Sequence, residues 1–166
     1  MNRFAIEIKW GIIYSCAVLA WMSFEKAIGL HDEKIDRHAN FTLLFAIPSI
    51  AIFVLAILDK KRNYYSGYFK WKDGFKSGMM VTMIVVILSP VIQYIIHTLI
   101  TPDFFRNVIE YSVNHGGMKR EEAEGYFNLK NYMIQSVISA LVMGTIISAL
   151  VSVFLRKEKS NFTGSY

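Results

Sequence analysis

Four long apolar runs constrain the fold of this chain more than any other feature. They cover about residues 6–30, 41–58, 75–100 and 132–155 of the 166-residue sequence. A helix of about 20 apolar residues crosses the hydrocarbon core of a bilayer, and each run is close to that length. The chain is 54% hydrophobic, which is typical of a membrane protein. We therefore expect an all-α integral membrane four-helix bundle that forms one domain over residues 1–166.

The distribution of Lys and Arg predicts the orientation of these helices. If the runs alternate in direction, eleven of the 18 Lys and Arg residues fall on the side that holds both chain ends, and seven fall on the other side. Cytoplasmic loops of membrane proteins carry the excess of Lys and Arg. Both termini are therefore predicted to be cytoplasmic, and residues 101–131 are predicted to lie outside the membrane.

The segment between the second and third runs, DKKRNYYSGYFKWKDG at residues 59–74, interleaves cations with aromatic side chains. Aromatic side chains of this kind favour the headgroup layer, and cations there attract anionic lipids. We interpret the segment as an anchor to membrane lipids, with a docking site for a cytoplasmic partner as the alternative. The net charge of +5 does not indicate nucleic-acid binding, because the cations cluster at the ends of apolar runs.

The segment 101–131 contains a predicted helix outside the bilayer. The letters ITPDFF favour Thr101 as N-cap and Pro102 as the first helical residue. Apolar residues then fall on one face until a pair of glycines at residues 116–117 ends the helix. We expect a short amphipathic helix here, between the third and fourth membrane helices, and we expect the residues after it to run directly into the fourth.

The fourth run carries a small residue at every fourth position. These residues are Ser136, Ala140, Gly144, Ser148 and Ser152. Lipid provides little hydrophobic drive for helix association, so small side chains that allow close approach favour packing. The stripe is predicted to pack against another helix of the same chain. A homodimer seam is the main alternative, and a ligand-lining role is another.

Four polar residues within the runs form a candidate ligand site: Glu25, Gln93, His97 and Gln135. A charged side chain in the middle of a membrane helix costs about 2.5 to 3.5 kcal/mol, so it requires a partner or a function. Because the runs alternate in direction across the membrane, all four residues are expected in the half of the bundle nearer its outer side, at a similar depth. They are expected to form either a structural hydrogen-bond cluster or a site for a proton, a cation or a small polar solute.

No metal or cofactor is expected from the sequence. All four histidines, His31, His38, His97 and His115, fall on the predicted outer side, and HDEKIDRH adds three carboxylates. The spacing matches no metal-ligand motif, so a divalent-metal site is only a minor alternative. The chain also lacks GxSxG, HExxH and P-loop motifs, so no catalytic residue is assigned and the protein is predicted not to be an enzyme.

Several stretches resemble one bacterial family over nearly the whole chain. They are EIKWGIIYS, LFAIPSI, KRNYYSGYFKWKDGFKSG, ILSPVIQYIIHTLITPDFF and REEAEGYFNLKNYMIQSVISALVMG. Together they resemble the family catalogued as domain of unknown function 4199. The resemblance implies a small four-helix protein of the bacterial inner membrane, of the kind found in Bacteroidetes. It implies no activity and no functional residues.

These features favour a non-enzymatic membrane protein that associates with itself or with another membrane component, such as a lipid or another membrane protein. The motivating features are the small-residue stripe, the short loops and the lack of a catalytic constellation. The alternative is a transporter, or a transporter subunit, for a proton-coupled or cationic small solute that uses the polar patch of Glu25, Gln93, His97 and Gln135.

Overall fold

The computed structural model describes residues 4–157, and these residues form an all-helical bundle. Four helical segments within them are long and apolar enough to cross a membrane: Ala5–Ala27, Ile35–Asn63, Trp71–Ile100 and Leu129–Leu155. The predicted fold class is therefore confirmed. The four apolar helices indicate a multi-pass membrane protein.

Two of the four spans contain a change in helix type. The second span consists of α2 (Ile35–Thr42), a 3-10 turn η1 (Leu43–Phe45) and α3 (Ala46–Asn63). The third consists of α4 (Trp71–Ile95) and a π-helical turn η2 (Ile96–Ile100). The first span is α1 (Ala5–Ala27), and the fourth is α7 (Leu129–Leu155). Two short helices, α5 (Phe104–His115) and α6 (Arg120–Tyr126), lie between the third and fourth spans.

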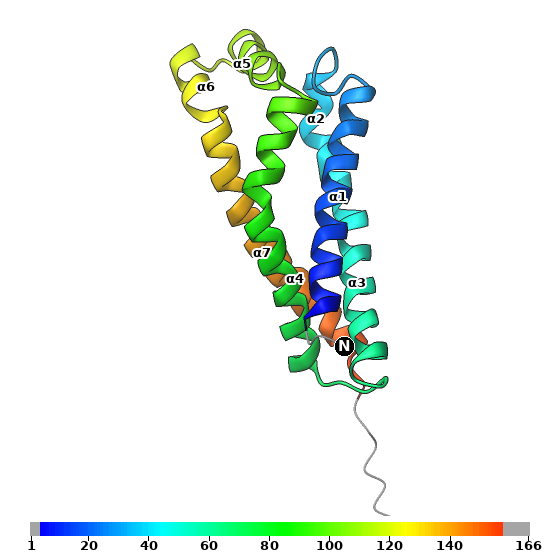
Figure 1. Cartoon of the computed structure of the whole chain (residues 1–166). Helices are drawn as coiled ribbons and strands as arrows, with labels where there is room; N and C mark the ends of the chain where they lie inside the picture. The colour runs from blue at the N-terminus through cyan, green and yellow to red at the C-terminus, as the bar shows by residue number, and fades with distance from the viewer. Residues whose placement is uncertain (1–3, 158–166) are drawn as a thin grey trace, which may run out of the picture.

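The spans alternate in direction, so the bundle has two distinct ends (Figure 1). The start of α1, the end of α3, the start of α4 and the end of α7 lie at one end, which we call the terminal end. The helices α2, α5 and α6 lie at the other end, which we call the α5 end. The helix α7 lies beside α4. Toward the α5 end, α7 moves away from α1 and α3 (Figure 1).

Small residues hold α4 and α7 together in the terminal half of the bundle. A Cβ atom added to Gly78 would lie 2.5 Å from the Ser148 side chain, and one added to Gly144 would lie 2.5 Å from Thr82. Ser152 is also fully buried, against the start of α4. The structure thus places three members of the stripe in a contact within the chain. The other two, nearer the α5 end, line a cavity described below.

Pro90 interrupts the backbone hydrogen bonding of α4, and a neighbouring side chain compensates. Proline has no N–H, so the carbonyl four residues earlier, that of Val86, loses its usual donor. The Ser89 hydroxyl donates to this Val86 carbonyl at 2.9 Å. Membrane helices tolerate proline when a nearby group satisfies the freed carbonyl, and Ser89 has that role here.

Two predictions about the segment between the third and fourth spans are wrong. Thr101 does not cap α5, because its N–H still bonds the carbonyl of Ile96 and ends the third span. The helix begins at Phe104 instead, after Asp103. The following residues also do not run directly into the fourth span. The chain breaks after α6, and the Asn128 side chain accepts the Asn131 N–H at 3.0 Å to begin α7 as a separate helix.

Candidate functional site

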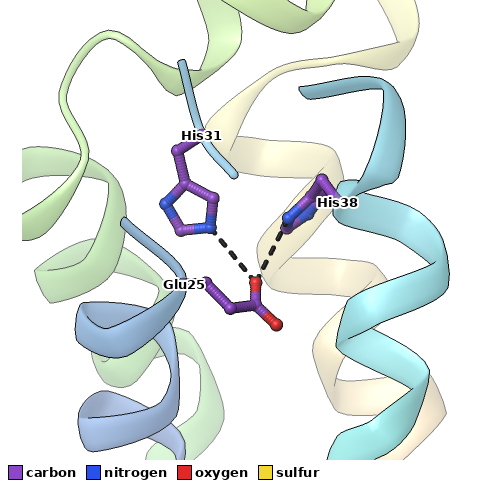
Figure 2. Close-up of side chains that lie close together, drawn as sticks. All are labelled: Glu25, His31 and His38. Carbon is purple, nitrogen blue, oxygen red and sulfur yellow. Dashed lines mark hydrogen bonds and ion pairs between the residues drawn. The ribbon is translucent and has the colours of Figure 1, made fainter. Parts of the chain in front are cut away.

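A buried carboxylate with two imidazoles lies at the α5 end of the bundle. Glu25, near the end of α1, has no solvent-exposed area. Its Oε2 atom lies 3.2 Å from Nε2 of His31 and 3.2 Å from Nδ1 of His38. Figure 2 shows both rings directed at this one oxygen. We call these residues, with Trp21 and Thr42 described next, the Glu25 cluster.

The second oxygen of Glu25 is held by two other donors. The Trp21 indole N–H donates to Oε1 at 2.5 Å, and the Thr42 hydroxyl donates to it at 2.9 Å. The same hydroxyl also lies 3.0 Å from Oε2. The indole therefore fixes Oε1, the imidazoles face Oε2, and the Thr42 hydroxyl contacts both oxygens. Within residues 4–157, the ion pairs of Glu25 are with the two histidines only, so no Lys or Arg compensates its charge.

The local sequence explains how the cluster assembles. Gly29 has a φ of +82°, a conformation that glycine adopts without strain. The chain therefore turns directly after α1, and the Leu30 N–H bonds the Glu25 carbonyl at 3.0 Å. After this turn α2 begins, and its residues His38 and Thr42 share one face because they are four positions apart. That face is directed at Glu25.

The helix α5 covers the cluster on the side away from the bundle. The Phe104 ring is almost completely buried, with its centroid 5.3 Å from that of His31 and 5.0 Å from that of His38. The Asn107 side chain donates to the His31 carbonyl at 3.0 Å and to the Asp32 carboxylate at 2.9 Å. These contacts fix the histidine loop and keep water away from the carboxylate.

The four residues of the predicted polar patch are only partly brought together. His97 and Gln93 are neighbours on the third span, with Nε2 of His97 3.1 Å from Oε1 of Gln93. Glu25 has the partners described above. Gln135 is exposed, and its amide lies 3.5 Å from the hydroxyl of Tyr126. A ligand-binding role for these four residues stays a prediction.

Two of the four histidines join Glu25, and sequence reasoning missed this arrangement. His97 packs against Phe104 and Phe105, while His115 stacks on Tyr111. The predicted apolar runs leave residues 31–40 outside the spans, so His38 was not expected on a helix that faces the bundle. A signal was nevertheless present, because His38 and Thr42 have helical spacing and lead directly into an apolar run.

A cavity of about 320 Å³ extends from the cluster toward the middle of the bundle. All four spans contribute to its wall, and both Trp21 and Thr42 line it. Most of the other lining residues are apolar, but a set of polar residues is included: Ser15, Ser49, Thr82, Ser89, Gln93, Ser136 and Ser139. The cavity exists because α7 diverges from α1 and α3 in this half of the molecule.

The terminal end holds a second buried carboxylate with a different set of partners. Glu7 is 2% exposed and its Oε1 lies 3.0 Å from Nζ of Lys60, which is 4% exposed. The Ser77 hydroxyl donates to the same oxygen at 2.9 Å. This ion pair, which we call the Glu7 pair, carries a compensating cation that the Glu25 cluster lacks.

Comparison with known proteins gives one family. The profile of a family described as "Protein of unknown function (DUF4199)" matches residues 9–157, which is most of the chain. The chain belongs to this family. The resemblance found in the sequence is thus confirmed. No curated protein and no solved structure matches the chain.

Proposed function

We propose that this member of the DUF4199 family is a non-enzymatic membrane protein that binds a membrane lipid in the cavity between its four spans. The observation that carries the proposal is the cavity of about 320 Å³ and its lining. Ligand cavities in proteins have volumes of about 300–1,000 Å³ and are mainly apolar, with a few polar groups that fix orientation. The cavity meets both conditions.

The dimensions of the cavity favour an extended chain over a helix of a partner protein. Its lining on the third span runs from Thr82 to Ile96. At 1.5 Å per residue this distance is about 21 Å. A cavity of about 320 Å³ spread over this length is narrow, whereas a helix with its side chains is about 10 Å wide. A lipid acyl chain is long and thin, and it requires no backbone partners.

The polar lining is positioned for the ester region of a lipid. Thr42 and Gln93 are at the α5 end of the cavity, and Ser136 lies opposite them at the start of α7. The opposite end is closed by a cluster of buried apolar side chains that includes Phe53, Val85 and Ile147. The acyl chain would therefore point toward the terminal end, and its polar head would lie near the Glu25 cluster.

Lipid retention in purified protein tests the proposal. Ala140 lines the cavity, so an Ala140→Trp variant would fill it. Val142 lies on the same helix but is 51% exposed, so Val142→Trp is the matched control. We expect native mass spectrometry to detect about one retained phospholipid in the wild type and in Val142→Trp, and none in Ala140→Trp. Equal retention in the two tryptophan variants would contradict the proposal.

Transport of a cation or of a proton-coupled solute is the second candidate. One observation favours it, because Thr42 and Gln93 both line the cavity and contact Glu25 and His97 respectively. However, packed apolar residues separate the cavity from the Glu7 pair, so a path across the bundle requires a second conformation. Unchanged proton or cation flux in vesicles containing Glu25→Gln would argue against transport.

The proposal places the protein in a bacterial inner membrane with both termini in the cytoplasm. The excess of Lys and Arg at the terminal end supports this orientation. Reporter enzymes fused to the C-terminus test this orientation. We expect activity from a reporter that works only in the cytoplasm. Activity only from a reporter that works in the periplasm would contradict the predicted orientation. Association with a second copy through the stripe is less favoured, since Gly144, Ser148 and Ser152 already pack within the chain.

A further inference from the structure

We propose that Glu25, His31 and His38 form a binding site for one divalent transition-metal ion of the zinc class. One ligand atom from each residue lies within 4.8 Å of the other two. In a tetrahedral zinc site with metal–ligand distances of about 2.0–2.2 Å, adjacent ligand atoms are roughly 3.3–3.6 Å apart. The two carboxylate–imidazole distances of 3.2 Å are close to this separation. The two imidazole nitrogens lie within 4.8 Å of each other, so rotation of the rings toward a shared ion would bring all three ligand atoms into range.

The donor set is chemically suited to zinc. Two imidazole nitrogens and one carboxylate oxygen form a ligand set that holds zinc and leaves a fourth position open for water or another ligand. Imidazole with carboxylate also accepts neighbouring first-row metals, so selectivity would depend on geometry. The chain offers no cysteine near this site, since Cys16 is nine residues before Glu25 on α1, closer to the terminal end.

The surroundings of the carboxylate are those of an oriented metal ligand. The Trp21 N–H holds Oε1, and the Thr42 hydroxyl lies within hydrogen-bond distance of both carboxylate oxygens, at 2.9 Å from Oε1 and 3.0 Å from Oε2. Metal-binding carboxylates are oriented by such outer hydrogen bonds. Phe104 packs against both imidazoles. His38 keeps 16% of its side chain exposed, which gives an ion a route of entry.

Electrostatics also favours a cation at this position. A buried carboxylate without a compensating charge is costly in a membrane protein, and Glu25 pairs with no Lys or Arg in the part of the chain that the structure describes. A divalent ion would supply the missing positive charge. The Glu7 pair needs no ion, because Lys60 already compensates that carboxylate.

Metal titration of the full chain in detergent micelles tests the site. We expect the wild type, stripped with a chelator and then supplied with Zn²⁺, to retain about one zinc per chain in elemental analysis. Co²⁺ in place of zinc should give the strong visible absorption of a four-coordinate ion. Replacement of a ligand in His31→Gln or His38→Gln should weaken binding by more than the 10–100-fold typical of an outer-shell change.

Two histidines of the same chain provide matched controls. His97 lies in the same region but outside the ligand set, and His115 is exposed on α5. His97→Gln and His115→Gln should each bind zinc like the wild type. Thr42→Val should weaken zinc binding by about 10–100-fold, because it removes only a hydrogen bond that orients Glu25.

X-ray absorption of the zinc-loaded wild type makes the test independent of variants that fail to fold. We expect a first shell of nitrogen and oxygen atoms, with the outer scattering of two imidazole rings. A wild type that retains no Zn²⁺ or Co²⁺ after desalting would overturn the proposal. It would also be overturned if the double variant His31→Gln/His38→Gln bound zinc as tightly as the wild type.

Discussion

The helix α1 carries two buried glutamates, and their surroundings differ in a way that separates structure from function. At the terminal end, Glu7 pairs with Lys60 and accepts the Ser77 hydroxyl. At the α5 end, Glu25 is surrounded by imidazole, indole and hydroxyl groups. The first carboxylate has a permanent counterion within the chain. The second has partners that can release or accept a proton or bind a metal.

The helices are also packed more tightly around Glu7 than around Glu25. Near the Glu7 pair, α4 and α7 approach so closely that Gly78 has no space for a Cβ atom. Near the Glu25 cluster, the spans diverge and leave a cavity of about 320 Å³. Tight packing with a compensated charge stabilises a fold and leaves no room for a ligand. We infer that the terminal half is the scaffold and that the half at the α5 end is the functional part.

The largest expected effect comes from removal of the cation at the terminal end. Lys60→Met would leave the buried Glu7 without its counterion, which typically costs about 3–5 kcal/mol. The double variant Glu7→Gln/Lys60→Met should recover most of this loss, because neither charge is then left alone. The free energy of unfolding, measured by denaturant titration in detergent, tests both expectations.

The matched change at the α5 end is His38→Gln in metal-free protein. Its glutamine can still donate a hydrogen bond to Glu25, so we expect a loss below about 1.5 kcal/mol. If this variant lost as much stability as Lys60→Met, the two carboxylates would not differ as described. The functional assignment of the α5 end would then rest on the cavity alone.

An effect smaller than that of Lys60→Met is expected from filling space in the two halves. Gly78→Ala would place a methyl group 2.5 Å from the Ser148 side chain and 3.2 Å from its Cα atom, so we expect a loss of about 1–3 kcal/mol. Ala140→Leu would extend into the cavity, so its effect should stay within about 0.5 kcal/mol. The same denaturant titration measures both. Equal losses would show that the half at the α5 end is packed as tightly as the terminal half.

The smallest expected effect concerns the helix break at Pro90. Ser89→Ala would remove the donor to the freed Val86 carbonyl, and interhelical or side-chain hydrogen bonds in membranes average about 0.6 kcal/mol. Ser23 is the control, since its hydroxyl donates to the Leu19 carbonyl in a helix without proline. Ser23→Ala should leave the melting temperature unchanged. A larger shift for Ser23→Ala than for Ser89→Ala would contradict the role of Ser89.

The spans could be predicted from the sequence because the apolar runs are long, whereas their boundaries depended on contacts that the runs do not encode. The second run was expected to begin near Phe41, but α2 starts at Ile35. Its polar residues belong to the helix because Thr42 and His38 on one side of it contact Glu25 and Phe104. Asn128 divides α6 from α7 through a side-chain cap that apolar periodicity does not reveal.

The composition of the candidate site was harder to predict than the fold. Sequence reasoning placed Glu25 in a polar patch with residues on other spans, whereas the structure places it against Trp21, His31, His38 and Thr42. Helix rotation and tilt decide such pairings, and the divergence of α7 leaves Gln135 exposed. Apart from Trp21, the observed partners come from the adjacent loop and from α2. A glycine turn after α1 brings them back to the carboxylate, and a sequence alone gives no tertiary geometry for such a turn.

The spacing of the two glutamates on α1 has a mechanical consequence. Glu7 and Glu25 are 18 positions apart, which is five complete helical turns and about 27 Å. Both carboxylates therefore leave the helix axis in the same direction. If α1 turned about its axis as a rigid rod, it would pull Glu7 from Lys60 and Glu25 from its imidazoles in a single motion. The fixed ion pair at one end thus sets the rotational position of the carboxylate at the other.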